Sequence, residues 1–226
     1  MILKGFRILD MSSLLPGPMC SLFLADLGAE VIKIESPKCD MMRYLEAESI
    51  KSPYFEALNR NKKSVVIDIK SKEGKEMFLG LAKEADVVIE GMRPGKAGIL
   101  GVGYNSVKKI NPGIVYCSIS GYGQKGPLKN KAGHDLNYAS LSGLLDVISH
   151  SPFVPGVQVA DAGSALVAAV SILAALLHRE KTGKGTYIDV SVFNSAISLI
   201  GMHIAHRSVS KKSDTILSGA MPCYNV

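Results

Sequence analysis

The sequence predicts an α/β protein with a Rossmann-like, mostly parallel sheet whose faces are covered by helices. Short runs rich in Val and Ile alternate with helical patterns, which is typical of strands joined by crossover helices. These runs are apolar at nearly every position, as expected for strands that helices bury on both faces. The chain has 226 residues, 47% of them hydrophobic and 20% charged, a composition that allows a large core and excludes disorder.

Six segments have the composition of strands, because each combines β-branched and aromatic residues between turn-forming ones. They are residues 6–11 (FRILDM), 30–35 (EVIKIE), 64–69 (SVVIDI), 86–91 (DVVIEG), 113–120 (GIVYCSIS) and 186–192 (TYIDVSV). Since helical segments separate most of them, we expect parallel pairing with right-handed crossovers.

Five segments have helical patterns. They are residues 16–28, 72–85, 135–148, 161–179 and a segment from about residue 193. The longest apolar run, residues 165–177, is too short to span a bilayer and predicts a buried helix. Long loops are expected near residues 36–60, 121–134 and 149–160, and ligands bind where such loops leave the carboxyl ends of strands.

Composition narrows the class of protein. The net charge of +6 either reflects scattered surface Lys or serves in part an anionic ligand. Basic residues occur in twos and threes among apolar ones, so no nucleic acid partner is expected. The four cysteines, Cys20, Cys39, Cys117 and Cys223, form no CxxC pair, so neither a metal site nor a disulfide framework is expected. With no signal-peptide pattern at the start, we expect a cytoplasmic protein without a membrane partner.

The turn after the first predicted strand disfavours a dehydrogenase. It reads SSLLPGP (12–18) rather than GxGxxG, and GVGY (101–104) follows no predicted strand. A bound nicotinamide or flavin is therefore not expected.

His134 and Asp135 lie side by side in KAGHDLNY (131–138), directly before a helical pattern. In one interpretation Asp135 caps the helix and His134 is structural. In the other, the imidazole belongs to a proton-transfer site, because its pKa lies near neutral pH. The residues alone leave both interpretations open.

Asp161, in VADAGS, is open to the same two interpretations. It is a good helix N-cap, but the small Gly163 and Ser164 also let a ligand approach backbone N–H groups that can hold an oxyanion. An apolar wall would raise the pKa of this carboxyl group, whereas the helix dipole would lower it. His134 and Asp161 together suit proton transfer from two sides of one carbon atom.

Basic turns lie at the predicted strand ends and in the long loops, where phosphates are often bound. They are SPK (36–38), NRNKKS (59–64) and MRPG (92–95), and the glycine-rich GYGQKGP (121–127) leads toward His134. Each is equally compatible with ordinary surface charge.

Eight blocks of the sequence resemble the class III CoA transferase family, also called the CaiB/BaiF family. They are GFRILDMSSLLPGP, LADLGAEVIKIE, LNRNKKSVVIDIK, ADVVIEGMRPG, INPGIVYCSISGYGQKGP, GHDLNY, VADAGS and REKTGKGTYIDVSVF. The resemblance covers essentially the whole chain. It implies a Rossmann-like large domain, a smaller second domain, an interlocked homodimer and acyl-CoA thioesters as substrates, with CoA as part of the substrate and no prosthetic group.

Within this family the resemblance implies two chemistries. The transferases use the Asp that matches Asp161 as a nucleophile and usually carry Tyr or Phe at the position of His134. The α-methylacyl-CoA racemases are similar to GHDLNY and use that His and the same Asp as an acid/base pair. The resemblance therefore favours a racemase or epimerase of 2-methyl-branched acyl-CoA thioesters, with His134 and Asp161 exchanging a proton through an enolate. Backbone N–H at the start of the second helix would face the thioester oxygen.

Two alternatives accompany this prediction. One is a class III CoA transferase that moves CoA between carboxylic acids through an acyl or CoA thioester intermediate on Asp161. The other is an inactive fragment or half-protein that needs a partner chain. By analogy with the family, nine positions are expected to contact CoA: Lys38, Asn59, Arg60, Lys63, Arg93, Tyr122, Lys125, Asp135 and Tyr138.

The domain organisation also follows from the resemblance. Residues 1–192 are expected to form the CoA-binding large domain, and residues 193–226 a helix and linker toward a small domain that is largely missing. The last segment, GAMPCYNV (219–226), resembles the start of that small domain. A later Glu that supports the His in racemases has no counterpart, so we expect truncation or a second polypeptide that supplies the missing region.

Overall fold

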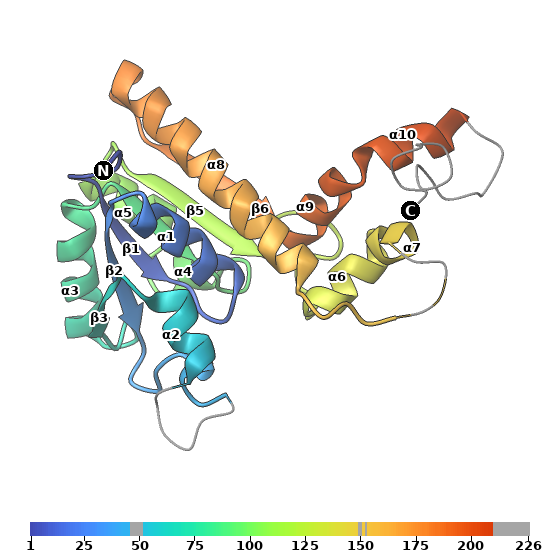
Figure 1. The fold of residues 1–226 in the computed structure, drawn as a ribbon. Coiled ribbons are helices and arrows are strands. Elements are labelled where there is room, and N and C mark those ends of the chain that lie inside the picture. The colour runs from blue at the N-terminus through green and yellow to red at the C-terminus, as the bar shows by residue number, and fades with distance from the viewer. Residues whose placement is uncertain (46–51, 149–150, 152, 210–226) are drawn as a thin grey trace.

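The computed structural model describes residues 1–45, 52–148, 151 and 153–209. Its centre is a six-stranded sheet with the strand order β3-β2-β1-β4-β5-β6 (Figure 1). The strands are β1 (Arg7–Met11), β2 (Glu30–Glu35), β3 (Lys63–Val66), β4 (Val87–Glu90), β5 (Val115–Ser120) and β6 (Thr186–Ser191). Every pairing is parallel, which confirms the predicted fold class.

Helices and one 3-10 turn connect the strands. They are α1 (Pro16–Asp26), η1 (Met41–Arg43), α2 (Pro53–Asn59), α3 (Lys72–Lys83), α4 (Lys96–Ile99), α5 (Tyr104–Ile110), α6 (Asp135–Leu141), α7 (Leu144–Ile148), α8 (Val159–Thr182), α9 (Val192–Leu199) and α10 (Gly201–Val209). In Figure 1, α6, α7, α9 and α10 extend away from the sheet on the side that α3 does not occupy.

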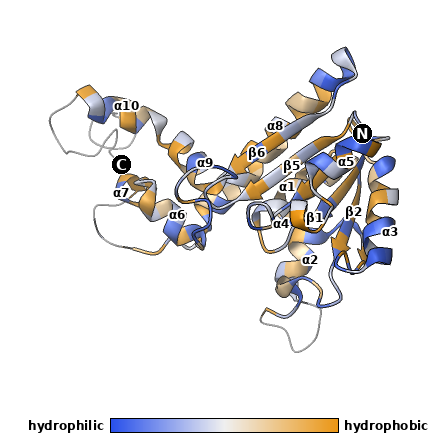
Figure 2. Cartoon of the chain, turned by 180° about the vertical axis from the view of Figure 1, so that it is seen from behind, coloured by the Kyte–Doolittle hydropathy of each residue, from blue (hydrophilic) through white to orange (hydrophobic). Residues whose placement is uncertain are grey.

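Two apolar cores lie on opposite faces of the sheet. Successive residues of a strand point to opposite faces, so Ile8 packs in the core beneath α1 and α8, and Leu9 in the core beneath α3 and α5. Both side chains are fully buried. Figure 2 shows the strands coloured mostly as hydrophobic and α3 with hydrophilic turns, as expected when helices cover both faces.

The boundaries of several elements differ from the predictions. The segment 135–148 forms two helices, because Gly143 adopts a left-handed conformation with φ of 81°. The segment from residue 193 likewise divides into α9 and α10. The predicted loop 36–60 contains η1 and α2, and α2 begins at Ser52-Pro53, a helix start signal. The predictions also missed α4 and α5. Strand β3 ends at Val66 rather than residue 69, so the edge strand is shorter than its apolar run.

Helix α8 is long and apolar enough to meet the length and composition of a membrane span, but half of its most apolar window is buried within the fold. Its buried face packs small residues such as Ala165, Ala168 and Ala169 against α1 and the sheet. The predicted helix is present, but it is buried on one face only, because Leu166, Val170 and Leu177 are exposed.

The predicted domain boundary falls where β6 ends and α9 begins, at Ser191 and Val192. It stays a prediction. Residues 219–226, the predicted start of a small domain, lie outside the described residues, as does Cys223. Of the other cysteines, Cys20, Cys39 and Cys117 are free.

Candidate functional site

A cavity of about 160 Å³ lies at the carboxyl edge of the sheet. Here the strand order reverses between β1 and β4, the place where open parallel sheets bind ligands. The cavity is lined by Ser12, Ser13, Leu14, Pro16, Gly17, Gly91, Ile119, Ser120, Gly121, Gly133, His134, Tyr138, Asp161 and Val192. The structure therefore brings the two predicted catalytic residues, His134 and Asp161, to one cavity from two different helices.

Glycines keep this cavity open. A Cβ atom at Gly121 would overlap the hydroxyl and ring of Tyr138, and one at Gly17 would overlap the side chain of Ser12. Gly133 has a similarly close approach to the Tyr138 ring. The loop after β5 can therefore pass close to Tyr138, and the first turn of α1 close to Ser12, only because no side chain stands at these positions.

Asp161 lies in the first turn of α8, which begins two residues earlier than predicted, at Val159. Asp161 is therefore not the N-cap. Its backbone N–H donates to Oδ1 of Asp135 over 2.9 Å, so this N–H is engaged within the protein rather than free for a thioester oxygen. Burial, and secondly the charge of Asp135, raise the pKa of Asp161 to about 7. Burial in the cavity wall is thus the main cause of the raised pKa, as expected for a carboxyl group against an apolar wall.

Tyr138 forms the wall between the helices and the β5 loop. Its hydroxyl donates to the carbonyl oxygen of Gly133 over 2.7 Å, and its ring meets that of Tyr122 edge-on at 5.1 Å between centroids. Burial, followed by the nearby charges of Asp161 and Tyr122, raises its pKa to about 12. Tyr138 is consequently a neutral hydrogen-bonding group at physiological pH.

His134 occupies the N-cap position of α6, so the structural interpretation describes its backbone correctly. Its backbone N–H donates to Oδ1 of Asn137 over 2.9 Å. The residue is exposed and lines the cavity. Position at a helix start and a place in the cavity are thus compatible, and the two interpretations do not exclude each other.

A second cavity, of about 140 Å³, adjoins the first and shares Ser12 and Ser13 with it. It opens between the ends of β1, β2 and β4. Its other lining residues are Met11, Lys33, Ile34, Glu35, Ser36, Cys39, Asp40, Ile67, Ile69 and Met92. The two cavities together follow the carboxyl edge on both sides of the β1–α1 loop.

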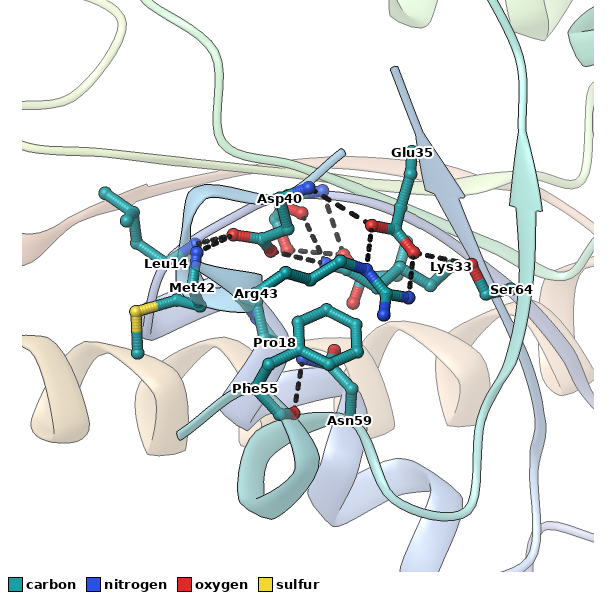
Figure 3. Close-up of polar contacts among 12 residues, drawn as sticks. Leu14, Pro18, Lys33, Glu35, Asp40, Met42, Arg43, Phe55, Asn59 and Ser64 are labelled. Atoms are coloured by element: carbon teal, nitrogen blue, oxygen red, sulfur yellow. Dashed lines mark hydrogen bonds and ion pairs between the residues drawn. The ribbon is translucent and has the colours of Figure 1, made fainter. Parts of the chain in front are cut away.

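Buried charges surround that loop (Figure 3). Nζ of Lys33 lies 2.9 Å from Oδ2 of Asp40, and both side chains are 1% exposed. Nζ of Lys62 lies 3.5 Å from Oδ2 of Asp10, and these side chains are equally buried. Burial raises the pKa of Asp10, but the charges of Lys33 and Lys62 and its hydroxyl partners more than offset that, so the pKa is lowered. Burial also lowers the pKa of Lys62 to about 8.

A further ion pair fixes the loop after β2. Arg43 donates to both carboxylate oxygens of Glu35, over 2.8 and 2.7 Å, and its guanidinium lies 3.7 Å from the centre of the Phe55 ring. Burial alone would raise the pKa of Glu35, but hydrogen bonds from Arg43 and Ser64 and from the backbone of Asp40 lower it to about 2.

The predicted CoA contacts divide by position. Arg93 follows β4 at the carboxyl edge and is exposed. The two residues before it line the cavities, Gly91 the first and Met92 the second. Lys38 and Lys125 are exposed in the loops after β2 and β5. Asp135 and Tyr138 adjoin Asp161, as described above. Their contact with CoA stays a prediction. The carboxylate of Asp135 accepts the backbone N–H of Asp161.

The remaining predicted contacts lie apart from the first cavity. Lys63 begins β3 and therefore lies at the amino edge, since a turn that precedes a parallel strand is at the edge opposite the ligand crevice. There it pairs with Glu30. Arg60 pairs with Asp26. The side chain of Asn59 is buried and bonds to the Phe55 carbonyl and to Lys62. Tyr122 packs against Tyr138 without lining the cavity.

The sequence analysis missed the part that the β1–α1 loop plays in the site. Ser12, Ser13 and Leu14 line the first cavity, and Ser120 contributes from the end of β5. Among the described residues, the buried Ser120 hydroxyl is one of the few side-chain groups without a hydrogen-bond partner. The segment SSLLPGP lacks a dinucleotide fingerprint and lies in the block GFRILDMSSLLPGP, but none of its residues is predicted as a site residue. Its place directly after the first strand is the signal that marks it as part of a ligand site.

Comparison with known proteins agrees with this architecture. The profile of CoA-transferase family III matches residues 3–225. Succinyl-CoA:glutarate CoA-transferase of Mus musculus is 40% identical over 216 residues, covering 93% of this chain and 50% of the relative. Succinyl-CoA:mesaconate CoA-transferase of Haloarcula hispanica is 34% identical over 233 residues, covering 97% of this chain and 59% of the relative.

A solved structure is similar over nearly the whole chain. The crystal structure of a CaiB/BaiF family protein from Brucella suis superposes with a TM-score of 0.90 at 35% identity, covering 97% of this chain and 61% of that one. The chain spans about half the length of the curated relatives it matches. Because the family profile covers nearly the whole chain and the solved structure shares its fold, the chain belongs to CoA-transferase family III.

Proposed function

We propose that the protein transfers CoA between carboxylic acids, with Asp161 as the nucleophile. The observation that carries this proposal is a carboxylate in the wall of the cavity at the switch point, with its pKa raised to about 7. Relatives that match the chain at 40% and 34% identity are named CoA-transferases, which favours transfer over the racemase reaction that GHDLNY suggested. A carboxylate desolvated in this way is a better nucleophile than one in water.

The chemistry balances without any further reagent. The Asp161 carboxylate attacks the thioester carbonyl of the donor acyl-CoA, an anhydride forms, and CoA thiolate leaves. The thiolate then attacks the aspartyl carbonyl, which gives an Asp161–CoA thioester and releases the donor acid as a carboxylate. The acceptor carboxylate repeats these two steps in reverse order, so that Asp161 is regenerated as new acyl-CoA forms.

The two adjoining cavities suit a long, anionic thioester. The first would hold the reacting carbonyl beside Asp161, and the second would lie along the path of the remaining CoA. Arg93 and Lys38 stand near these cavities and offer cationic groups to phosphates. CoA enters as part of the substrate, and the proposal requires no prosthetic group.

Trapping the intermediate tests the proposal. After incubation with acyl-CoA, hydroxylamine should convert Asp161 to a hydroxamate, and borohydride should reduce the thioester to an alcohol. Peptide mass spectrometry would locate either product on Asp161, and Asp161→Asn should abolish both. Transfer activity without any trapped product on Asp161, under conditions that trap a reference thioester, would contradict the proposed nucleophile.

Racemisation is the second candidate function, and one observation favours it. His134 and Asp161 line the same cavity, so an imidazole and a carboxyl group are both available to a bound acyl group. A racemase would exchange the α-hydrogen of a 2-methyl-branched acyl-CoA in deuterated water with no acceptor acid present. His134→Ala should abolish that exchange. If the unmodified protein transfers CoA but does not exchange the α-hydrogen, racemisation is excluded and CoA transfer remains as the proposed function.

We further propose that the active form contains more than one chain of this length. The resemblance to the class III CoA transferases implies an interlocked homodimer. A cytoplasmic location would suit such an enzyme. Native mass spectrometry of the protein from its source gives the masses of all chains in the assembly. A monomer with neither transfer nor exchange activity would support an inactive fragment instead.

A further inference from the structure

The β1–α1 loop is held from below by one buried ion pair (Figure 3). Nζ of Lys33 donates to the carbonyl oxygen of Ser12 over 2.9 Å and lies equally close to Oδ2 of Asp40. The other oxygen of Asp40, Oδ1, accepts the backbone N–H of Leu14 over 3.4 Å. The pair thus contacts the loop at two backbone atoms, two residues apart.

The loop needs this external support. Leu14 has a φ of 65°, a left-handed conformation that is unfavourable for a residue with a Cβ. Asp40 is itself fixed, because its backbone N–H donates to Glu35, which Arg43 holds on both oxygens. The unfavourable backbone of Leu14 therefore rests on a rigid group of buried charges.

The same pair belongs to both cavities. Lys33 and Asp40 line the second cavity, whereas Leu14, which Asp40 contacts, lines the first. Ser12, whose carbonyl Lys33 binds, lines both. Both side chains are already excluded from water, so a ligand group in the second cavity would act by contact. It would restrict the position of the ion pair and, through the pair, the two hydrogen bonds to the loop.

We infer that Lys33 and Asp40 are positioning residues that couple occupancy of the second cavity to the shape of the first. The inference rests on the proposed function, in which the remote part of CoA occupies the second cavity. Binding energy from that remote part then fixes the Ser12–Leu14 wall beside Asp161 and raises turnover, rather than only tightening substrate binding.

Comparison of two substrates tests the coupling. In the double variant Lys33→Met/Asp40→Asn both charges are removed together, so no buried charge is left unpaired, and Asn retains an oxygen for the Leu14 N–H. At saturating acyl-CoA we expect kcat to fall about tenfold or more. With the same acyl group on pantetheine, which lacks the nucleotide end, kcat should change by less than about threefold. An equal loss for both substrates, or a rise in KM alone, would overturn the inference.

A matched control removes a comparable ion pair from the opposite edge. Nη2 of Arg179 lies 2.9 Å from Oδ1 of Asp86, and the side chains are 15% and 25% exposed. Arg179→Met/Asp86→Asn should lower the melting temperature while it leaves the kcat ratio of the two substrates unchanged. A shifted ratio in this control would assign the effect to general destabilisation and count against the coupling.

A measurement on the unmodified protein guards against a variant that does not fold. Adenosine 3′,5′-bisphosphate carries the nucleotide end of CoA without the pantetheine arm. Its addition should slow hydrogen exchange at the Leu14 amide by about threefold or more. Absence of protection, including failure of the bisphosphate to bind, overturns the inference. Protection in a protein that transfers no CoA would retain the coupling and reject the proposed function, so the two failures are distinguishable.

Discussion

At the scale of single residues, Asp161 is the position where structure decides chemistry. Its carboxyl group lies in a cavity wall, its N–H is bound by Asp135, and the two acidic side chains are close enough for the charge of one to act on the other. Both burial and like charge favour the protonated form, so the group titrates near neutral pH instead of remaining ionised throughout the physiological range.

The rate of CoA transfer should follow this titration. Because only the carboxylate attacks a thioester, kcat/KM of the free enzyme should rise with pH to a midpoint near 7 and then level off. In Asp135→Asn the neighbouring negative charge is lost while an amide oxygen remains for the Asp161 N–H, so the midpoint should move to lower pH. Steady-state rates from pH 5 to 9 measure both midpoints. A midpoint that Asp135→Asn leaves in place would contradict the electrostatic cause.

Protein stability should change with pH in the opposite direction to the rate, because the contribution of Asp161 decreases as the pH rises. The pKa of Asp161 is raised from 3.8 to about 7, so between these values the folded state binds a proton that the unfolded state has lost. The contribution of this group to stability is present at low pH and is lost as the pH rises through about 7. Asp161→Asn has no carboxyl group to titrate at this position and so does not lose this contribution. Its free energy of unfolding, relative to that of the unmodified protein, should therefore increase by about 1–3 kcal/mol from pH 4 to pH 8. Urea unfolding at both pH values tests this, and parallel pH dependences would refute it.

At the scale of elements, the contact between the β5 loop and α6 sets the shape of the cavity. Gly121 follows β5 directly, and Tyr138 packs on it from α6. The hydroxyl of Tyr138 reaches back to Gly133 just before the helix. One aromatic side chain therefore joins the strand end, the following loop and the helix.

Gly121→Ala should disturb this junction. The added methyl group overlaps Tyr138, and overpacking of this kind costs about 1–3 kcal/mol. Displacement of Tyr138 toward Asp161 should also lower kcat/KM. The control is Gly80→Ala on α3, where a Cβ meets nothing within 4 Å, and where Ala should raise stability by up to about 1 kcal/mol. Thermal unfolding of both variants should show opposite signs, and an unchanged melting temperature in Gly121→Ala would contradict the packing argument.

At the scale of the whole molecule, the net charge of +6 favours association with an anionic substrate. Exposed Lys and Arg such as Lys38, Arg93 and Lys125 stand in loops at the carboxyl edge, whereas Lys63 is paired with Glu30 at the amino edge. The charge at the carboxyl edge is therefore the part that a CoA thioester would meet.

Salt should weaken this attraction. The screening length falls from about 10 Å at 0.1 M to about 3 Å at 1 M ionic strength, so kcat/KM for acyl-CoA should decrease severalfold between these conditions. The same acyl group on pantetheine carries no phosphate of the nucleotide end, and its kcat/KM should change much less. Initial rates in sodium chloride series test the difference, and equal salt dependence for both substrates would argue against electrostatic steering.

The parallel α/β architecture follows from local patterns, because apolar runs of strand length separated by helical patterns have few other ways to bury both faces. The positions of His134 and Asp161, at predicted helix starts beside glycine or small residues, make them candidate catalytic residues. The structure places both at one cavity, and their roles stay predictions. The eight sequence blocks correctly predict the family to which the chain belongs. The block GHDLNY favours racemisation, whereas relatives that match nearly the whole chain favour CoA transfer.

The surroundings of these groups depend on the folded arrangement of distant segments. The β1–α1 loop entered the site because β1 and β4 are neighbours at the switch point, although they are far apart in sequence. Lys63 lies at the edge opposite the predicted CoA site, because strand direction, and not proximity in sequence, determines which turns face a ligand. The pKa of Asp161 depends on burial and on Asp135, which α6 and α8 bring together. Local patterns encode element type, whereas desolvation and charge contacts depend on segments that meet only in the folded chain.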